Sequence, residues 1–328
     1  MKEVAKMAGV SQTTVSRVIS GNTSVSTEIK ARVMECIHKL DYQPNIIAQI
    51  LVGNKTLLIG VIITDISNPF FSDIIKAIEK ETANCGYSLI LCNTDGSLEK
   101  EKKYINILKS YKVDGILIVP SDARDKSFKS LRNSKVPIVV ITQDVEDFSC
   151  VSMSHYIGGK KVARHLIDRG YSKFVFVGYE NDEKEKGFKG EIESSGFNID
   201  TQYTFIDKNK NNSVTADLKE VILSNLNRQS LGVFTHNDVE ALLVLNVLKE
   251  LKVDVPEKVA LIGFDNTYIA KEVSPSISSV SQLVEEIGSK AVEMLMDKIN
   301  SNEKIQEKHV ILEPRLVIRE SSVKLVEY

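Results

Sequence analysis

The sequence has few of the features that mark secreted or membrane-bound proteins. Its four cysteines fit neither paired metal-ligand spacing nor the disulfide framework of a small secreted domain: Cys36, Cys85, Cys92 and Cys150. We expect reduced thiols packed in hydrophobic cores. No apolar run approaches the roughly 18 to 20 residues needed to span a bilayer, and the chain does not start with a signal-peptide segment. The cytoplasm is therefore the expected compartment.

Motifs of common enzyme chemistry are also missing. The segment 158–161 looks like a phosphate loop, but Ser154 stands where that motif has its first glycine and Lys161 where it has serine or threonine. No Gly-x-Ser-x-Gly nucleophile elbow occurs, and no Gly-x-Gly-x-x-Gly follows a predicted strand. The five histidines are scattered without ligand spacing. We therefore expect no enzyme activity, no cofactor and no metal site.

The first twenty residues instead show the pattern of a helix-turn-helix. The first helix is expected to have an apolar side made of Val4, Ala5, Met7 and Ala8. Gly9 supplies the turn that lets a second helix cross the first. Three residues of the second helix are at helical spacing and are expected to pack inward: Val15, Val18 and Ile19. Its outward side then carries four polar residues that can reach DNA bases or phosphates: Gln12, Thr13, Ser16 and Arg17. A plain amphipathic helix pair that caps a larger core has the same pattern.

A third helix and a short apolar linker follow. Ser26 offers an N-cap, and four apolar residues recur at helical spacing behind it: Ile29, Val33, Ile37 and Leu40. Pro44 ends this helix, and Asn45 can cap the apolar segment 46–53. The purely structural interpretation of that segment is an interdomain helix buried against a hydrophobic core. The predicted domains are a helix-turn-helix domain at 1–44, a hinge at 45–56 and a larger domain at 57–328.

Charge is distributed unevenly along the chain. Residues 1–55 carry seven Lys or Arg against four Asp or Glu, a balance of +3, and the remaining residues carry 35 against 40, a balance of −5. A cationic head suits binding to phosphates, and an acidic body repels DNA elsewhere. The asymmetry is modest and supports the motif without proving it.

The large domain alternates short apolar runs with stretches of helical periodicity. Seven runs are predicted as strands: 57–63, 88–92, 115–119, 138–141, 174–177, 231–234 and 259–263. Their grouping predicts an α/β body of two lobes with parallel sheets. The chain is expected to pass between the lobes at 149–154, at 276–282 and before Arg315.

Polar and aromatic residues follow several of these strands. Ligands of open parallel sheets bind beyond the carboxyl ends of the strands, so these positions are candidates for a ligand site. They are Asn68, Phe70, Phe71, Asn237, Asp265 and Gln282. Each also has a structural interpretation: Asn68 could cap a helix, the phenylalanines could be core, and Asp265 could be a solvated charge.

The whole arrangement resembles the lactose-repressor (LacI/GalR) family of bacterial transcriptional regulators. The similarity rests on Val4-Ala5, on Ala8-Gly9-Val10-Ser11, on Thr14-Val15-Ser16-Arg17-Val18, and on Tyr42-Gln43-Pro44-Asn45 followed by Ala48 and Leu51. The Asn-Pro-Phe-Phe element that starts at Asn68 is also similar. Family members often have a few more residues before the position of Lys2.

The resemblance implies a reading head, a hinge and a sugar-binding body similar to periplasmic binding proteins. It implies major-groove contacts by Gln12, Thr13 and Arg17, and a hinge helix in the minor groove with Leu51 wedged between base pairs. The predicted DNA-contacting set is Ser11, Gln12, Thr13, Thr14, Ser16, Arg17, Asn45, Ala48 and Leu51. Inserting a side chain into the stack costs roughly a few kcal/mol, which gives the apolar hinge a physical reason.

Two departures from the family concern the ligand. Where the family has Asp-Arg after its fourth strand, this chain has Thr142-Gln143, and Lys184 replaces an arginine three residues before Gly187. The predicted effector is therefore a sugar, with a sugar acid or sugar phosphate favoured, unless Asp144 lies in the cleft. The predicted effector-contacting set is Asn68, Phe70, Phe71, Thr142, Gln143, Lys184, Asn237, Asp265 and Gln282.

Together these features predict a homodimeric repressor that an effector releases from a palindromic operator. Two-fold symmetry lets two heads match two half-sites of double-stranded DNA. Three alternatives stay open from the sequence. The effector could be required for DNA binding, the body could respond to a partner protein, or the chain could be a sugar-binding protein without a regulatory role.

Overall fold

The computed structural model describes residues 1–19, 25–42, 55–207, 214–225, 230–301, 303 and 305–323. The chain forms two compact units, the head at Met1–Leu57 and the body at Leu58–Tyr328. Among the residues described, no helix is both long enough and apolar enough to cross a membrane.

The head is a three-helix unit made of α1 (Lys2–Ala8), α2 (Gln12–Ile19) and α3 (Thr27–Lys39). Gly9 takes a left-handed conformation, with φ of 63°, and ends α1 so that α2 can turn away. Ser26 caps α3, as expected, by accepting a hydrogen bond from the Ile29 N–H. The small core that joins the three helices contains Val4, Ala5, Ala8, Val15, Val18, Val33 and Cys36.

Two expectations for the head are wrong in detail. Met7 is 52% exposed and Leu40 is 37% exposed, so neither belongs to the core. Leu40 is the C-cap of α3, which ends one residue earlier than its apolar spacing suggested. Cys36, which lies between the helical positions used for the prediction, packs into the core instead.

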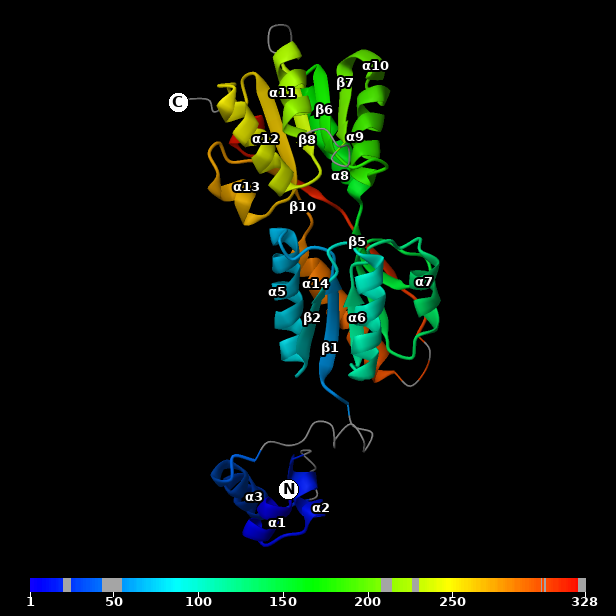
Figure 1. The fold of residues 1–328 in the computed structure, drawn as a ribbon, viewed down its shortest axis with the longest axis vertical. Helices are drawn as coiled ribbons and strands as arrows, with labels where there is room; N and C mark the ends of the chain where they lie inside the picture. The colour runs from blue at the N-terminus through cyan, green and yellow to red at the C-terminus, as the bar shows by residue number, and fades with distance from the viewer. Residues whose placement is uncertain are drawn as a thin grey trace. The chain divides into compact units, whose positions relative to one another are not determined.

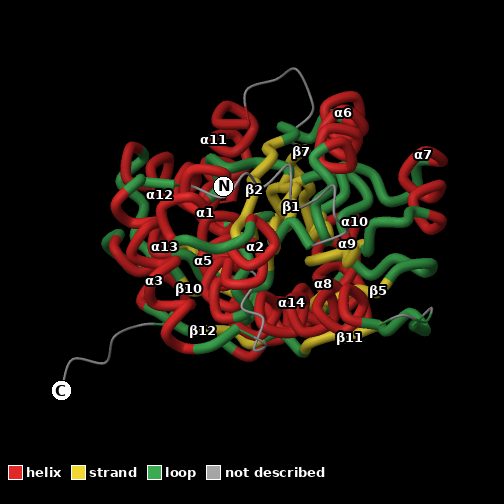
Figure 2. Tube along the Cα trace, turned by 90° about the horizontal axis from the view of Figure 1, so that it is seen from below, coloured by secondary structure: helices red, strands yellow, loops and turns green. Residues whose placement is uncertain are grey.

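The body consists of two lobes, each a six-stranded sheet covered by helices (Figure 1). Figure 2 shows the helices in red around the yellow strands. The first lobe has strand order β11-β5-β4-β3-β1-β2, and all its neighbouring strands are parallel. Its strands are β1 (Leu58–Ile63), β2 (Ser88–Asn93), β3 (Gly115–Ile118), β4 (Ile138–Thr142), β5 (Ser149–Met153) and β11 (His309–Leu312). Its helices are α5 (Pro69–Asn84), α6 (Leu98–Ser110), α7 (Lys126–Lys129) and α14 (Val284–Asn300).

The second lobe has strand order β12-β10-β9-β8-β6-β7, in which only β10 and β12 are antiparallel among the pairs described. Its strands are β6 (Lys173–Gly178), β7 (Tyr203–Asp207), β8 (Leu231–Thr235), β9 (Val259–Asp265), β10 (Ser278–Ser281) and β12 (Arg315–Val317). Its helices are α8 (His155–Asp168), α9 (Glu183–Ser194), α10 (Ile199–Gln202), α11 (Val214–Asn225), α12 (Asp238–Glu250) and α13 (Tyr268–Glu272).

The chain passes between the lobes at the three predicted places. The first passage runs through Ser154, the second through Gln282 and Leu283, and the third through Glu313 and Pro314. The Ser154 N–H donates to the Leu312 carbonyl at 3.3 Å, which joins the first passage to the third. Residues 149–153 and 278–281 are themselves sheet strands, and neither was among the predicted strands, nor were β7, β11 and β12.

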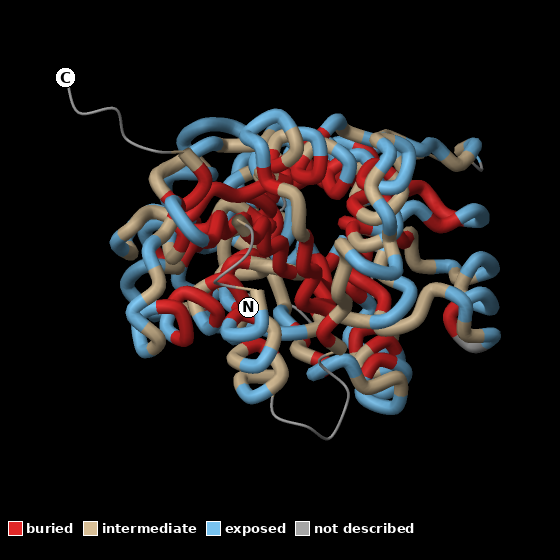
Figure 3. The backbone as a smooth tube through the Cα atoms, turned by 90° about the horizontal axis from the view of Figure 1, so that it is seen from above, coloured by how far each residue is buried: buried red, intermediate tan, exposed pale blue. Residues whose placement is uncertain are grey.

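Hydrophobic cores fill both faces of each sheet. Figure 3 shows the buried backbone in red at the interior, with exposed segments at the periphery. Cys92 and Cys150 are buried within the first lobe, as expected of core thiols. Cys85 is exposed, contrary to expectation, because it lies at the C-cap of α5 where the chain reaches the surface.

The segment that looked like a phosphate loop is part of α8. A Cβ atom on Gly159 would lie 2.0 Å from the Lys184 carbonyl oxygen, and a Cβ on Gly187 of α9 would lie 2.0 Å from the Tyr156 carbonyl oxygen. These glycines therefore allow α8 and α9 to pack backbone against backbone. The glycine pattern serves helix packing in the second lobe.

Candidate functional site

The outward side of α2 is polar, as the sequence indicates. Gln12, Thr13, Ser16 and Arg17 are exposed, while Val15 and Val18 are buried beneath them. The Ser11 hydroxyl accepts a hydrogen bond from the Thr14 N–H at 3.1 Å and also bonds the Thr14 hydroxyl at 2.9 Å. Ser11 and Thr14 thus start the helix. The predicted hinge residues Asn45, Ala48 and Leu51 lie outside the described residues.

A cavity of 510 Å³ in the body is lined by residues from both lobes. Its walls come from segments at the carboxyl ends of β1, β3 and β4 in the first lobe and of β6, β8 and β9 in the second. All nine residues of the predicted effector-contacting set line it: Asn68, Phe70, Phe71, Thr142, Gln143, Lys184, Asn237, Asp265 and Gln282. We call this cavity the cleft.

Three helix N-termini place polar side chains at the cleft. Asn68 caps α5 by accepting the Phe70 N–H, and Asn237 caps α12 by accepting the Glu240 N–H, each at 3.0 Å. Asp182 caps α9 in the same way by accepting the Lys184 N–H at 3.0 Å. Helix N-termini carry partial positive charge, so they favour oxygen-rich ligands and side chains. Capping and lining the cleft are therefore compatible roles for Asn68.

Asp265 is the centre of a buried hydrogen-bond chain. It accepts a hydrogen bond from Gln282 Nε2 at 2.5 Å, and Gln282 Oε1 lies 3.2 Å from His155 Nε2. An amide oxygen only accepts, so His155 Nε2 carries the proton of this bond. Burial raises the pKa of Asp265 to about 7 and lowers the pKa of His155 to about 4. The Asn68 side chain of the opposite lobe also faces Asp265 and acts to lower its pKa.

A second chain forms another part of the same second-lobe wall. Lys184 is buried, donates from Nζ to the His236 carbonyl at 2.8 Å, and has that atom 4.2 Å from the centroid of the Phe264 ring. His236 Nδ1 lies 2.5 Å from Asp182 Oδ2. Burial opposes ionisation of Asp182, but Lys184 and His236 hold its pKa well below its usual range. The wall therefore presents a buried ionised carboxylate beside a buried lysine.

The sequence analysis missed Asp182 and His236. Asp182 stands two residues before Lys184 as a helix cap, and His236 directly precedes Asn237 at the end of a strand. Both signals were readable from the sequence, since a polar residue at the carboxyl end of a parallel strand is a ligand candidate.

The charges of the cleft differ from the sequence expectation. Among the described lining residues, four are carboxylic acids, Asp65, Asp182, Glu240 and Asp265, and Lys184 is the one lysine or arginine. Asp144 lies outside the cleft and contacts His309 at 2.6 Å. The expected loss of a carboxylate at Thr142-Gln143 is thus offset by other acids. This balance argues against a sugar acid or sugar phosphate as ligand.

The backbone around the cleft adopts conformations that side chains rarely allow. Thr142 has φ of 69°, Asp265 has φ of 101°, and Leu283, next to Gln282, has φ of 54°. A β-branched residue at positive φ is a marked outlier, and each such residue costs on the order of 1–3 kcal/mol. Strain of this kind concentrates at ligand sites, where it holds side chains in position.

Comparison with known proteins identifies relatives of both units. Residues 1–45 match the family described as "Bacterial regulatory proteins, lacI family", and residues 163–322 match a "Periplasmic binding protein-like domain". The chain is 31% identical to the HTH-type transcriptional regulator RegA of Clostridium saccharobutylicum, covering 98% of this chain and 99% of RegA. It is 31% identical to the HTH-type transcriptional repressor PurR of Photobacterium profundum, covering 98% of each chain.

Solved structures agree with these relatives. The transcriptional regulator CelR in complex with cellobiose is 26% identical, covers 98% of both chains and has a TM-score of 0.69. A LacI family transcriptional regulator from Enterococcus faecium with bound ribose is 26% identical, covers 82% of this chain and 100% of that one, and has a TM-score of 0.70. The lac repressor dimer bound to operator is 22% identical, with a TM-score of 0.82, and shows the same fold.

Proposed function

Because this chain belongs to the lacI family of bacterial regulatory proteins and is a DNA-binding transcriptional regulator, we propose that it is a repressor released from its operator by a neutral sugar. The observation that carries the proposal is the cleft, in which side chains of both lobes surround one cavity of sugar size. As a regulator of bacterial genes it acts in the cytoplasm, on a palindromic operator, as a homodimer.

In this proposal α2 reads the operator. Gln12, Thr13, Ser16 and Arg17 are exposed on one side of a helix that is anchored by its buried valines. Arginine pairs with guanine through two hydrogen bonds, and glutamine pairs with adenine in the same way. Ser11 and Thr14 contact phosphates at the start of the helix. Asn45, Ala48 and Leu51 are proposed to enter the minor groove at the operator centre.

The cleft has the composition that recognises a polyhydroxylated ring. The carboxyl groups of Asp182 and Asp265 can accept hydrogen bonds from sugar hydroxyls, and the amides of Asn237 and Gln143 can both donate and accept hydrogen bonds. Phe70, Phe71 and Tyr179 supply apolar contact for the carbon face of a sugar. The surplus of carboxylates favours a neutral sugar, since an anionic ligand would add like charge to a buried site. The similar structures hold cellobiose, ribose and D-xylulofuranose.

Ligand binding is coupled to DNA through the two lobes. A sugar that contacts Asp265 in the second lobe and Asn68 in the first favours one relative orientation of the lobes. Gln282 bonds Asp265 and lies in the second passage between the lobes, so a change at Asp265 reaches the passage directly. By linkage, operator binding lowers the affinity for the sugar by the same factor by which the sugar lowers the affinity for the operator.

The test starts from the full-length chain and sheared genomic DNA. Bound fragments are selected and sequenced with and without a mixture of neutral pentoses, hexoses and disaccharides, and in parallel with a mixture of sugar acids and sugar phosphates. We expect one enriched palindrome whose enrichment collapses with the neutral mixture only. If the palindrome is enriched only when the sugar is present, the sugar is required for operator binding and does not release the repressor.

Calorimetry with the individual sugars then measures the cleft itself. An Asp265→Asn variant serves as the matched control, because it keeps the size of the side chain and removes the charge. Tight binding of a sugar acid together with no binding of any neutral sugar would refute the proposed ligand class. Sugar binding that Asp265→Asn leaves unchanged would refute the proposed site.

A further inference from the structure

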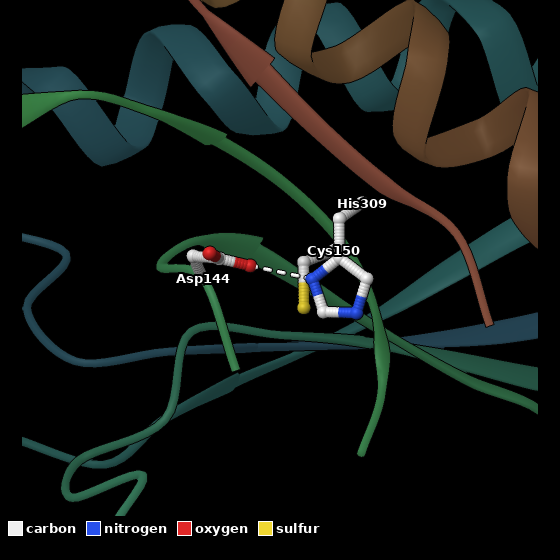
Figure 4. A group of neighbouring side chains, drawn as sticks. All are labelled: Asp144, Cys150 and His309. Atoms are coloured by element: carbon white, nitrogen blue, oxygen red, sulfur yellow. Dashed lines mark hydrogen bonds and ion pairs between the residues drawn. The ribbon is translucent and has the colours of Figure 1, made fainter. Parts of the chain in front are cut away.

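Three residues with metal-ligand side chains meet on the first lobe, outside the cleft. They are Asp144, Cys150 and His309, and one ligand atom of each lies within 4.8 Å of the others (Figure 4). None of the three lines the cleft. We propose that these residues form a binding site for one zinc-class divalent cation.

The fold brings these residues together from three separate segments. His309 is the first residue of β11, and it pairs in register with Cys150 of β5 in a parallel arrangement. Cys150 also pairs with Val140 of β4, the strand that ends just before Asp144. Partners in register on neighbouring strands are about 4.8 Å apart and share a face of the sheet. The sequence spacing between residues 150 and 309 hides this arrangement, so the expectation of no metal site rested on spacing alone.

The three side chains form a ligand set that suits zinc. Thiolate, imidazole and carboxylate are its usual ligands, at about 2.3 Å for sulfur and about 2.0 Å for nitrogen and oxygen. Asp144 Oδ1 and His309 Nδ1 are 2.6 Å apart and share a hydrogen bond. Two ligand atoms of a tetrahedral ion lie roughly 3.3 Å apart by those bond lengths, so the pair opens by roughly 0.7 Å to admit the ion.

The burial of the three side chains also fits a metal site. Cys150 is fully buried, and its Sγ accepts the Val145 N–H at 3.2 Å, a contact that orients the sulfur. The side chains of His309 and Asp144 are 36% and 49% exposed, so they provide the entry path and leave the fourth ligand position to water. The charges of Asp144 and Glu307 lie near the sulfur and favour a cation, whereas Lys298, which is paired with Glu307 at 2.6 Å, opposes it.

Binding exchanges protons for the ion. The thiol proton now lies near the carbonyl oxygens of Val145 and Phe148, at 3.2 and 3.1 Å from the sulfur. Cys150 loses that proton as the bond from sulfur to the metal forms, and the proton leaves to solvent. His309 binds through Nδ1 as the neutral ring with its proton on Nε2. No electron is transferred, and no other reactant is required.

The site would fasten two connections of the first lobe to each other. Asp144 belongs to the loop between β4 and β5, and β11 leads directly into the third passage between the lobes. A bound ion therefore ties this loop to the strand that enters the passage. Binding to the folded state alone also raises its stability.

The test uses cobalt as a spectroscopic substitute for zinc. Full-length protein is reduced, freed of metal with a chelator, and titrated with Co²⁺ while the sulfur-to-cobalt charge-transfer band is recorded. We expect saturation at one equivalent and displacement by Zn²⁺. Cys150→Ser should abolish the band, and His309→Gln should weaken Co²⁺ binding by more than about tenfold.

Matched controls separate this site from other thiols. Cys92→Ser removes another buried thiol of the same lobe, and Cys85→Ser removes the exposed one, so both should leave the titration unchanged. A band that survives Cys150→Ser or disappears in Cys85→Ser overturns the proposal, as does the absence of stoichiometric binding. If Cys150→Ser does not fold, Co²⁺ affinity that is unchanged in His309→Gln overturns it equally.

Discussion

Two glycines of α9 allow a sharp test of how the second lobe positions the cleft. A Cβ on Gly187 would lie 2.0 Å from the Tyr156 carbonyl oxygen, 2.8 Å from its carbon and 3.0 Å from its Cα. All three atoms are backbone, so no side-chain rotation relieves the clash, and α8 and α9 must separate by more than about 1 Å. A Cβ on Gly190 meets only the Tyr156 hydroxyl, at 3.5 Å, which is ordinary contact.

The two substitutions to alanine should therefore change stability in opposite directions. Replacing a helical glycine by alanine favours the helix by about 0.8–1.0 kcal/mol. Overpacking of a close contact costs about 1–3 kcal/mol and occasionally more. Gly190→Ala should gain up to about 1 kcal/mol, and Gly187→Ala should show a net loss of up to about 2 kcal/mol, because the cost of overpacking exceeds the same helical gain.

The cleft gives a second measurement. Asp182 and Lys184 lie at the N-terminal end of α9, so a displaced helix moves both out of the cleft wall. Gly187→Ala should therefore weaken effector binding while Gly190→Ala leaves it unchanged.

Urea unfolding followed by circular dichroism reports the stability of each variant, and the chain contains no tryptophan that would serve instead. Calorimetry reports the affinity for the effector. A Gly187→Ala midpoint at or above that of the unmodified chain would refute the backbone contact. Equal losses of stability in both variants would refute the argument that the space available to the added Cβ decides the effect.

Three further predictions follow from single residues. Arg17→Ala should lower discrimination among operator variants by about 1–3 kcal/mol in gel-shift titrations, and unchanged preference would exclude Arg17 from base reading. Burial raises the pKa of Asp265 from 3.8 to about 7, so the folded state holds the proton up to about pH 7 and stability falls as the pH rises between these two values. Asp265→Asn should therefore raise the urea midpoint at about pH 8, with a gain that shrinks toward about pH 5; a gain that grows on acidification would contradict this sign. A thiol reagent should modify Cys85 alone in the folded chain, because the other three cysteines are buried, and mass spectrometry that finds Cys92 modified before unfolding would contradict the packing.

The local patterns of the sequence predicted the secondary structure well where burial was one-sided or continuous. The spacing of Val15 and Val18 placed α2 correctly, and the apolar runs of β1, β3 and β9 marked strands that are buried except at Leu58. Strand β5 was missed because it contains Ser149, Cys150 and Ser152, whose polar side chains are buried by hydrogen bonds and packing. A run that mixes polar and apolar residues gives no strand pattern in the sequence. It can still be a buried strand when its polar side chains find hydrogen-bond partners inside the fold.

The predicted site residues do line the cleft, but the charge of the cleft could not be predicted from the sequence. Position at the end of a strand identified Asp265, because parallel strands bring their carboxyl ends to one edge. The ionisation of Asp182 depends on the approach of Lys184 and His236, and His236 comes from a different strand. Contacts of that kind follow from the tertiary fold, so the sequence suggested an anionic ligand that the assembled site disfavours.

The three passages between the lobes also determine the order in which the body can fold during synthesis. Helix α14 contributes Ile287, Ala291 and Leu295 to the core of the first lobe, but it follows β5 by about 130 residues. At roughly 5–20 residues per second the ribosome needs about 7–26 s to supply it. Throughout that interval one face of the first sheet is covered by α5 but lacks α14, while the strands of the second lobe are completed except for β12. The nascent chain of this regulator therefore exposes an apolar sheet face on which chaperones could bind before the first lobe closes.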